Sequence, residues 1–223
     1  MSESGTSPTT SRPRGRPAGG SVGGRERVLA AALELFPISG FASTTVEDLV
    51  TSAGVTAPVL YHHFGTKAGL YVAAAEHVYR IVLDRYEAVL AGDPTFAQAI
   101  DRMMDLAAVL RDEQPMLAPM MLAVVIDTQR DPELAERLSP TVRAFRQFFD
   151  RVAALAPDAL QPTPEAPRSL ALALVTLMNG LDITALMART PEDYRRTVAS
   201  LHALLHHGTT GIAAGGSHDS SRT

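Results

Sequence analysis

Apolar residues recur at three- and four-residue spacing along most of the chain, which is the period of an amphipathic α-helix. The clearest example is a narrow apolar stripe formed by Val46, Leu49, Val50 and Ala53. Thr44 and Glu47 have the spacing of a capping box, so a helix is predicted to begin at Thr44. Gly54 ends the stripe, because glycine readily adopts the left-handed conformation of a helix C-terminus. Pro58 then falls in the first turn of a second, short helix that ends near His63.

The same spacing, interrupted by glycine and proline, predicts helices along the rest of the chain. Their expected ranges are 24–38, 66–90, a helix after Pro94 that ends near 111, a short helix beginning near Pro115 or Pro119, 132–156 with a bend or restart at Pro140, 165–188 and 191–207. Aromatic residues make up only 5% of the sequence, and alanine and leucine are abundant. The fold class is therefore predicted to be all-α, with about nine helices.

Two short helices joined through a glycine-containing turn describe a helix-turn-helix, whose second helix lies in the DNA major groove. The surrounding sequence resembles the N-terminal DNA-binding domain of TetR-type (TetR/AcrR) transcriptional regulators in the runs RERVLAAALELF, GF, TTVEDLVTSAGV and VLYHHFGTKAGL. The resemblance is continuous from Arg25 to Leu70, and LYHHF-x-x-K is its most specific part. Four segments are expected: a disordered arm (1–24), a DNA-binding domain (25–70), a ligand-binding and dimerisation domain (71–207) and a flexible tail (208–223).

The resemblance implies a set of DNA contacts on and around the second helix. The residues implied at base edges are Ala57, Pro58 and Val59, those at the backbone and neighbouring bases are Tyr61 and His62, and those at phosphates are Thr45 and Lys67. Val46 and Ala57 are apolar where many members of the family carry hydrogen-bonding side chains. Base recognition is then expected to depend on thymine methyl groups and DNA shape more than on bidentate hydrogen bonds.

The N-terminal arm contains Arg12-Pro13-Arg14-Gly15-Arg16-Pro17, which is similar to the core of an AT-hook. Arg14 and Arg16 would enter an A·T-rich minor groove, or the arm would contact phosphates without sequence preference. Residues 1–67 hold six Lys/Arg against five Asp/Glu, whereas residues 68–223 hold fourteen against nineteen. The net charge of −4 therefore lies in the C-terminal part, which is compatible with DNA binding at the other end.

The C-terminal part concentrates methionine and phenylalanine in its central helices. Such residues can line an adaptable cavity, or they can simply fill a core. Because TetR-type regulators commonly bind small apolar or amphipathic ligands here, a pocket is expected from Met103, Met104, Met120, Met121, Asp127, Phe145, Phe149 and Met178. Asn179, Thr176 and Asp182 are further candidates for polar anchors, although residues of this kind are more often surface or interface residues.

The last two predicted helices carry more apolar residues than one protomer would bury. The family resemblance implies that they form a four-helix bundle with a two-fold mate. The expected interface consists of Leu170, Leu174, Leu177, Leu181, Val198, Leu201 and Leu205. His202 and His206 have the spacing of a metal pair, but no third ligand is evident, so no metal is expected.

Several functions are excluded by what the sequence lacks. The chain has no cysteine, which removes disulfides, zinc fingers and thiol catalysis, and it has no G-x-S-x-G, P-loop or H-E-x-x-H motif, so neither an enzyme nor a cofactor is expected. No signal peptide or long uninterrupted apolar run is evident, which favours a cytoplasmic protein with no membrane partner. The sequence predicts a homodimeric repressor released from a palindromic operator by an unidentified small-molecule effector. A ligand-independent architectural protein and an activator are the alternatives.

Overall fold

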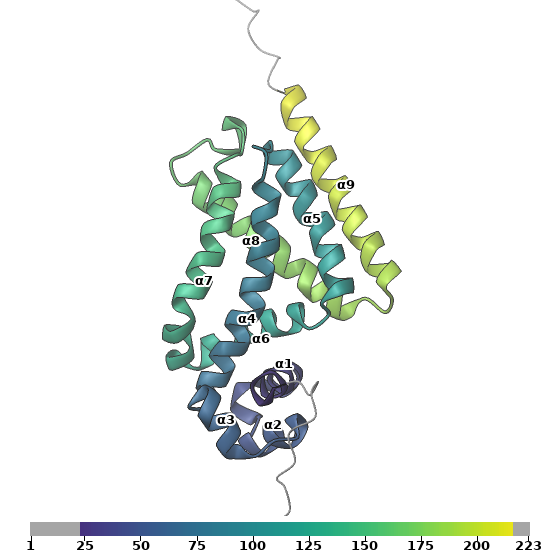
Figure 1. The fold of residues 1–223 in the computed structure, drawn as a ribbon. Helices are drawn as coiled ribbons and strands as arrows, with labels where there is room; N and C mark the ends of the chain where they lie inside the picture. Colours follow the sequence, from purple (N-terminus) through teal and green to yellow (C-terminus); the bar gives the residue numbers. More distant parts are fainter. Residues whose placement is uncertain (1–22, 216–223) are drawn as a thin grey trace, which may run out of the picture.

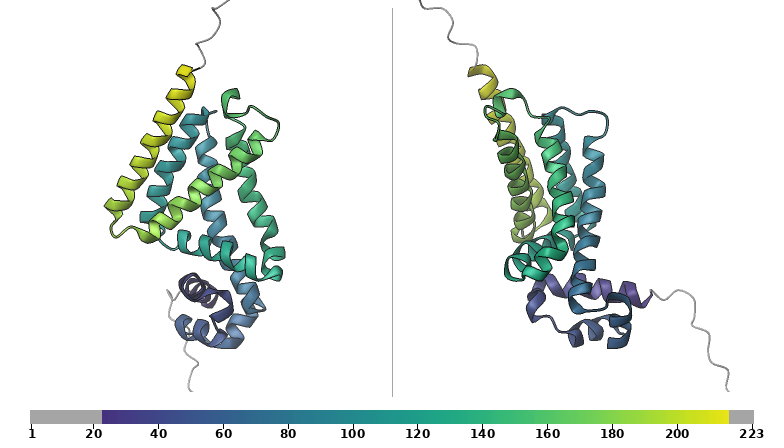
Figure 2. Two further views of the ribbon diagram at one scale, coloured as in Figure 1. Left: turned by 180° about the vertical axis from the view of Figure 1, so that it is seen from behind. Right: turned by 90° about the vertical axis from the view of Figure 1, so that its left-hand side faces the viewer.

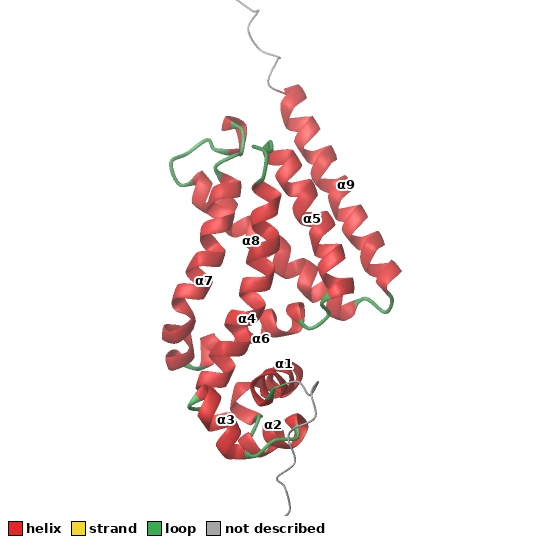
Figure 3. Cartoon of the chain, viewed as in Figure 1, coloured by secondary structure: helices red, strands yellow, loops and turns green. Residues whose placement is uncertain are grey.

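The computed structural model describes residues 23–215, with side chains up to residue 205. This part of the chain contains nine α-helices, two short 3-10 helices and no strand, which confirms the predicted all-α class (Figures 1 and 3). The helices are α1 (Gly24–Ser43), α2 (Val46–Ala53), α3 (Ala57–Phe64), α4 (Lys67–Glu87), η1 (Ala88–Leu90), α5 (Phe96–Glu113), α6 (Leu117–Arg130), α7 (Pro132–Ala153), η2 (Asp158–Leu160), α8 (Ala166–Met187) and α9 (Pro191–Gly215).

The first three helices and the start of α4 form a small head below the larger body (Figure 1). Its centre consists of side chains with no exposed surface, namely Phe36 of α1, Leu49 of α2, Leu60 of α3 and Leu70 of α4. Gly69 allows α4 to start close to the end of α3, because a Cβ at this position would lie 2.1 Å from the carbonyl oxygen of Phe64. The head is therefore one unit that holds α3 in a fixed orientation.

In the head, the start of α2 lies one residue after its predicted position, and the predicted break at Gly40 is present but is followed by a further turn. The capping box at the start of α2 joins Thr45 and Asp48, in place of Thr44 and Glu47: the Thr45 hydroxyl accepts from the Asp48 amide, and the Asp48 carboxylate accepts from the Thr45 amide. Thr44 is buried, and its hydroxyl donates to the carbonyl of Gly40. The first helix also continues to Ser43 as a further turn after the expected break at Gly40, which has a φ of 75°.

The body is built on α4, which leaves the head and packs against α6 and α7 (Figures 1 and 2). Helix α8 packs on α7, helix α9 lies beside α5, and α6 lies across the end of the body that faces the head. Pro140 does not interrupt α7, which runs continuously from Pro132 to Ala153. The last helix extends to Gly215, eight residues beyond its predicted end.

Helix α8 carries an apolar surface that the protomer leaves open. Among the described helices it alone has the length and composition of a membrane span, a feature that the sequence prediction missed, yet only 22% of that window is buried. Its exposed large apolar side chains are Leu172, Ile183, Leu186 and Met187.

Candidate nucleic-acid interface and ligand cavity

The turn between α2 and α3 has the geometry of a helix-turn-helix. Gly54 ends α2 in the left-handed conformation, with a φ of 61°, and its amide donates to carbonyls in the last turn of α2. The Arg27 guanidinium donates to the Gly54 carbonyl at 3.1 Å, which ties α1 to this turn. The residues of the sequence pattern thus bring α2 and α3 together, with α3 on the outside of the head.

Helix α3 has one buried side and one exposed side. Leu60 is fully buried, whereas Pro58, Tyr61 and His62, which share a face at three- and four-residue spacing, are all exposed. Val59 is half-buried and lies close to α1, because a Cβ at Gly24 would be 3.0 Å from its Cγ1. Ala57 is also half-buried. Of the residues expected at bases, the exposed face therefore presents Pro58, Tyr61 and His62 most fully.

Lys67 and Thr45, the two expected phosphate contacts, have partners inside the head. The Lys67 ammonium donates to the carbonyls of Phe41 and Thr44, both at 2.8 Å, and lies 4.5 Å from the centre of the Phe41 ring. These contacts hold the end of α1, a role that the sequence pattern did not indicate. The hydroxyl and amide of Thr45 are engaged by Asp48. Phosphate binding by either residue stays a prediction, and it competes with these internal contacts.

Other charges on the head were missed by the sequence analysis. Arg25 and Arg27 are exposed on α1, and the Arg25 guanidinium lies 5.5 Å from the ring of Phe64 on α3. Val46 is half-buried and packs against the core of the head. Arg14 and Arg16 lie outside the residues that the structure describes.

Asp127 joins the body to the head and does not lie in the cavity wall, which corrects its expected role. Its carboxylate, on α6, accepts from the amide of Phe41 at 3.0 Å and from the hydroxyl of Tyr71 at 2.9 Å. The rings of Phe41 and Tyr71 also contact each other, with centres 5.2 Å apart. Burial, with the charge and hydrogen bond of Asp127, raises the pKa of Tyr71, so its hydroxyl remains a donor. We call this arrangement of Asp127, Phe41 and Tyr71 the head–body contact.

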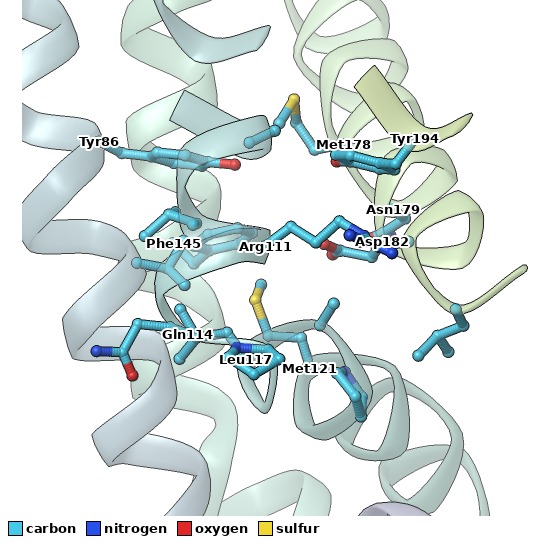
Figure 4. A pocket seen from close by; sticks show the side chains of 18 residues that line it. Tyr86, Arg111, Gln114, Leu117, Met121, Phe145, Met178, Asn179, Asp182 and Tyr194 are labelled. Carbon is cyan, nitrogen blue, oxygen red and sulfur yellow. The ribbon is translucent and has the colours of Figure 1, made fainter. Parts of the chain in front are cut away.

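A cavity of about 180 Å³ lies in the body between α4, α5, α6, α7, α8 and α9 (Figure 4). Three of the predicted pocket residues, Met121, Phe145 and Met178, line it. The other predicted residues, Met103, Met104, Met120 and Phe149, do not line it and have at most 1% of their surface exposed. Their side chains fill the core between the helices, so the alternative of ordinary core packing holds for these four.

Polar side chains enter the cavity from several helices (Figure 4). Asp182 and Asn179 come from α8, and both had been candidates for polar anchors, whereas Thr176 is exposed and its hydroxyl donates to Leu172. Residues that the sequence analysis missed are Tyr86, Arg111, Gln114 and Tyr194. Desolvation by burial raises the pKa of Asp182 to about 7. One signal was available in the sequence: Asp182 is the only acidic residue within the apolar helix α8.

The predicted dimer residues divide into two groups. Leu174, Leu181 and Val198 are buried inside the protomer, so they cannot form the interface as predicted. Leu170, Leu177, Leu201 and Leu205 are half-buried. The exposed large apolar side chains lie elsewhere on the same two helices, at Leu172, Ile183, Leu186, Met187 and Leu204. An interface on α8 and α9 stays a prediction, and its exposed apolar residues differ from those expected.

The head and the body together define a helix-turn-helix protein with a separate helical domain that contains a cavity. Residues 28–74 match the family model described as bacterial regulatory proteins, tetR family. Residues 95–209, which are half of the chain, match the model described as BetI-type transcriptional repressor, C-terminal. The chain belongs to the TetR family of transcriptional regulators, which confirms the predicted family and the prediction that the protein is not an enzyme.

Curated relatives share parts of the chain. The regulator CymR of Pseudomonas putida is 32% identical over 120 residues, which cover 54% of this chain and 58% of CymR. The transcriptional activator FasR of Mycolicibacterium smegmatis is 38% identical over 76 residues, which cover 30% of this chain and 35% of FasR. The matched segments thus span little more than half of these relatives at most.

Solved structures share the whole architecture. A transcriptional regulator from Rhodococcus sp. Rha1 is 26% identical, with a TM-score of 0.63 over 82% of this chain and 96% of that chain. FadR from Bacillus subtilis, in complex with stearoyl-CoA, has a TM-score of 0.65 at 16% identity, over 81% of this chain and 96% of that chain. A transcriptional regulator from Saccharomonospora viridis, in complex with choline, has a TM-score of 0.58 at 19% identity, over 79% of this chain and 93% of that chain. These last two show the fold alone.

Proposed function

We propose that this protein is a homodimeric, cytoplasmic repressor that leaves its operator when a small ligand enters the cavity of the body. The observation that carries this proposal is the position of α6, which belongs to both sites. Leu117 and Met121 of α6 line the cavity, and Asp127 of the same helix makes the head–body contact. Asp127 is six positions after Met121, which is about 9 Å along a helix. A ligand that moves α6 would therefore act directly on the head.

The head–body contact gives this movement a defined effect. Asp127 accepts the amide of Phe41, which lies in the last turn of α1, and the hydroxyl of Tyr71 in the first turns of α4. A shift of α6 would either carry α1 and α4 with it or strain the hydrogen bonds from Phe41 and Tyr71 to Asp127. Either outcome changes the equilibrium between orientations of α3, and a ligand that prefers one orientation shifts that equilibrium.

A second copy of the chain is the proposed cover for the exposed side of α8. Leu172, Ile183 and Met187 form an apolar strip on this helix, and Leu204 is exposed on α9. A surface of this kind is typical of an interface in a soluble protein. Two-fold pairing would present two α3 helices to successive major grooves, about 34–36 Å apart on a palindromic site.

The proposed DNA contact is the exposed face of α3 with the basic residues around it. The described part of the head, residues 23–67, contains three Lys/Arg and four Asp/Glu, so the head itself supplies little positive charge. The arginines at positions 12, 14 and 16 supply the other positive charges of the N-terminal part. We propose that they contribute a large share of the phosphate or minor-groove binding.

Selection of bound fragments from the whole source genome, followed by footprinting at increasing salt, tests the proposal. We expect protection of a palindrome with steep loss of affinity as salt rises. Failure to enrich any palindromic site would contradict the proposed function. Addition of a ligand that binds the cavity should then dissociate the protein from this DNA. Tighter binding with ligand, or transcription that rises on binding, would instead indicate an activator, as FasR is named.

A further inference from the structure

Asp182 is a carboxylate without a partner in the cavity wall. It is half-buried on α8, and within residues 23–205 it has neither a hydrogen bond nor an ion pair. The same wall holds Met178, one turn earlier on α8, and the rings of Tyr86, Phe145 and Tyr194, together with the polar side chains of Arg111, Gln114 and Asn179. Removing a charge from water without a compensating contact is costly. The group therefore has a strong tendency to bind a cation or a hydrogen-bond donor.

The one cationic residue of the cavity wall does not satisfy Asp182. The Arg111 guanidinium lies 5.0 Å from the centre of the Tyr194 ring and 3.7 Å from the carboxylate of Asp112. Its charge thus faces a neighbouring acid and an aromatic ring, while its buried Nε has no hydrogen-bond partner among the described residues. Asp112 also pairs with Arg195. The negative charge of Asp182 is left without a counterion in the described structure.

The aromatic rings give the cavity a second feature that suits a positive charge. Tyr86 and Tyr194 enter from opposite sides, with their hydroxyl ends toward one another, and Phe145 lies between α4 and the cavity (Figure 4). The face of an aromatic ring attracts a cation, and this attraction strengthens when the cation is desolvated. Neither tyrosine hydroxyl has a hydrogen-bond partner among the described residues, so both are available to a ligand.

The volume limits the size of the ligand. About 180 Å³ is slightly more than the ~150 Å³ of an engineered protein cavity that holds benzene. The cavity is therefore suited to a compact ligand and too small for a long acyl chain.

We propose that the cavity binds a compact organic cation, a quaternary ammonium or a protonated amine, whose charge lies against Asp182 and whose alkyl groups contact Tyr86, Phe145 and Tyr194. This inference rests on the proposed function, because it names the chemical class of the effector for the same cavity. Asp182 supplies the countercharge, and the rings supply the apolar contacts.

The ionisation of Asp182 makes the proposal sensitive to pH. In the ligand-free protein, desolvation raises the pKa of this carboxyl to about 7. Burial raises the pKa of Tyr79 and Tyr194 to about 12 and raises that of Tyr86 further, so these tyrosines do not titrate between pH 5 and 8. The other charged residue of the wall is Arg111. A permanent cation should therefore bind most tightly above pH 7, and its affinity should fall about tenfold per pH unit at lower pH.

The test compares choline and benzyltrimethylammonium with their neutral carbon isosteres, 3,3-dimethyl-1-butanol and neopentylbenzene, by calorimetric titration of the full chain. We expect at least one cation to bind, and its isostere to bind at least about tenfold more weakly. Asp182→Asn should lower the affinity for the cation by a similar factor. Asp105→Asn, which makes the same change at an exposed position of α5 outside the cavity, should have no effect.

Three results would overturn the inference: neither cation binds, the neutral isostere binds as tightly, or Asp182→Asn retains the affinity of the wild type. The pH dependence is measured on the wild type alone, so it does not depend on how the variant folds, and an affinity independent of pH between 5 and 8 would also contradict the proposal. DNA binding is measured in parallel without ligand. If no operator is bound, the proposed function fails; if an operator is bound and the cations are not, only the ligand class fails.

Discussion

Two aspartates in the body, Asp127 and Asp182, have opposite environments. Asp127, at the junction with the head, is buried and accepts hydrogen bonds from Phe41 and Tyr71. Asp182, in the cavity, has neither a hydrogen bond nor an ion pair within residues 23–205. A buried polar group with its partners in place contributes to one defined structure, whereas one without them destabilises the protein until something binds it. The first arrangement suits a mechanical connection, and the second suits a ligand site.

The largest effect is expected from Asp127→Ala. This substitution leaves the Phe41 amide and the Tyr71 hydroxyl without their acceptor in a buried place, and each unsatisfied donor costs about 1–3 kcal/mol. We expect the free energy of unfolding in urea to fall by about 2–5 kcal/mol. Asp150→Ala, at an exposed position on α7, is the control and should change it little. A loss below about 0.5 kcal/mol would mean that the head–body contact does not hold the head in solution.

Asp182→Asn should raise the free energy of unfolding at pH 8, in contrast to Asp127→Ala, which should lower it. Because desolvation raises the pKa of Asp182 from 3.8 to about 7, the folded state holds a proton between these pH values that the unfolded state has lost. Wild-type stability must therefore fall as the pH rises through this window. The shift sets an upper limit of about 4 kcal/mol, and solvent screening at this half-buried position reduces it to about 1–2 kcal/mol. Urea unfolding should show a variant that is more stable at pH 8 and equal to the wild type at pH 4.

If Asp182→Asn is less stable than the wild type at pH 8, Asp182 has a stabilising partner, and its contrast with Asp127 is wrong. Repeating the unfolding experiment with a saturating cation tests this contrast further. A cation that binds only the folded wild type adds stability there, and it should add little to Asp182→Asn. The ligand would thus reverse the order of stability of the two proteins.

The head could be predicted from the sequence because its contacts are local. The turn glycine, the apolar stripe of α2 and the short α3 lie within about twenty residues, so spacing alone identifies them. The errors were small and had local causes: Thr44 and Thr45 are both competent caps, and only the fold decides which one is buried. The internal contacts of Lys67 were not predictable, because they depend on where the end of α1 lies.

The cavity could be predicted only in part because six helices contribute to it. Met121 lines the cavity while Met120, the next residue, fills the core, a distinction that depends on the rotation of α6 about its axis. The same uncertainty of about one residue placed Leu174 and Leu181 on the outside of α8 in the prediction and inside in the structure. Tyr86 and Tyr194 were missed because they lie more than a hundred residues apart and meet only in the folded body.

The smallest effect, Tyr71→Phe, separates the two donors of the head–body contact. Removing the hydroxyl takes one hydrogen bond from Asp127 but leaves its bond to the Phe41 amide, so we expect a loss of about 1 kcal/mol in urea unfolding. In the Asp127→Ala background, Tyr71→Phe should leave the free energy of unfolding unchanged or raise it, because it removes a hydroxyl that Asp127→Ala leaves without an acceptor. The double-mutant cycle should therefore give a coupling energy of about 0.5–3 kcal/mol. Strict additivity would show that Tyr71 and Asp127 act independently, and the bond at 2.9 Å would then not be what connects α4 to α6.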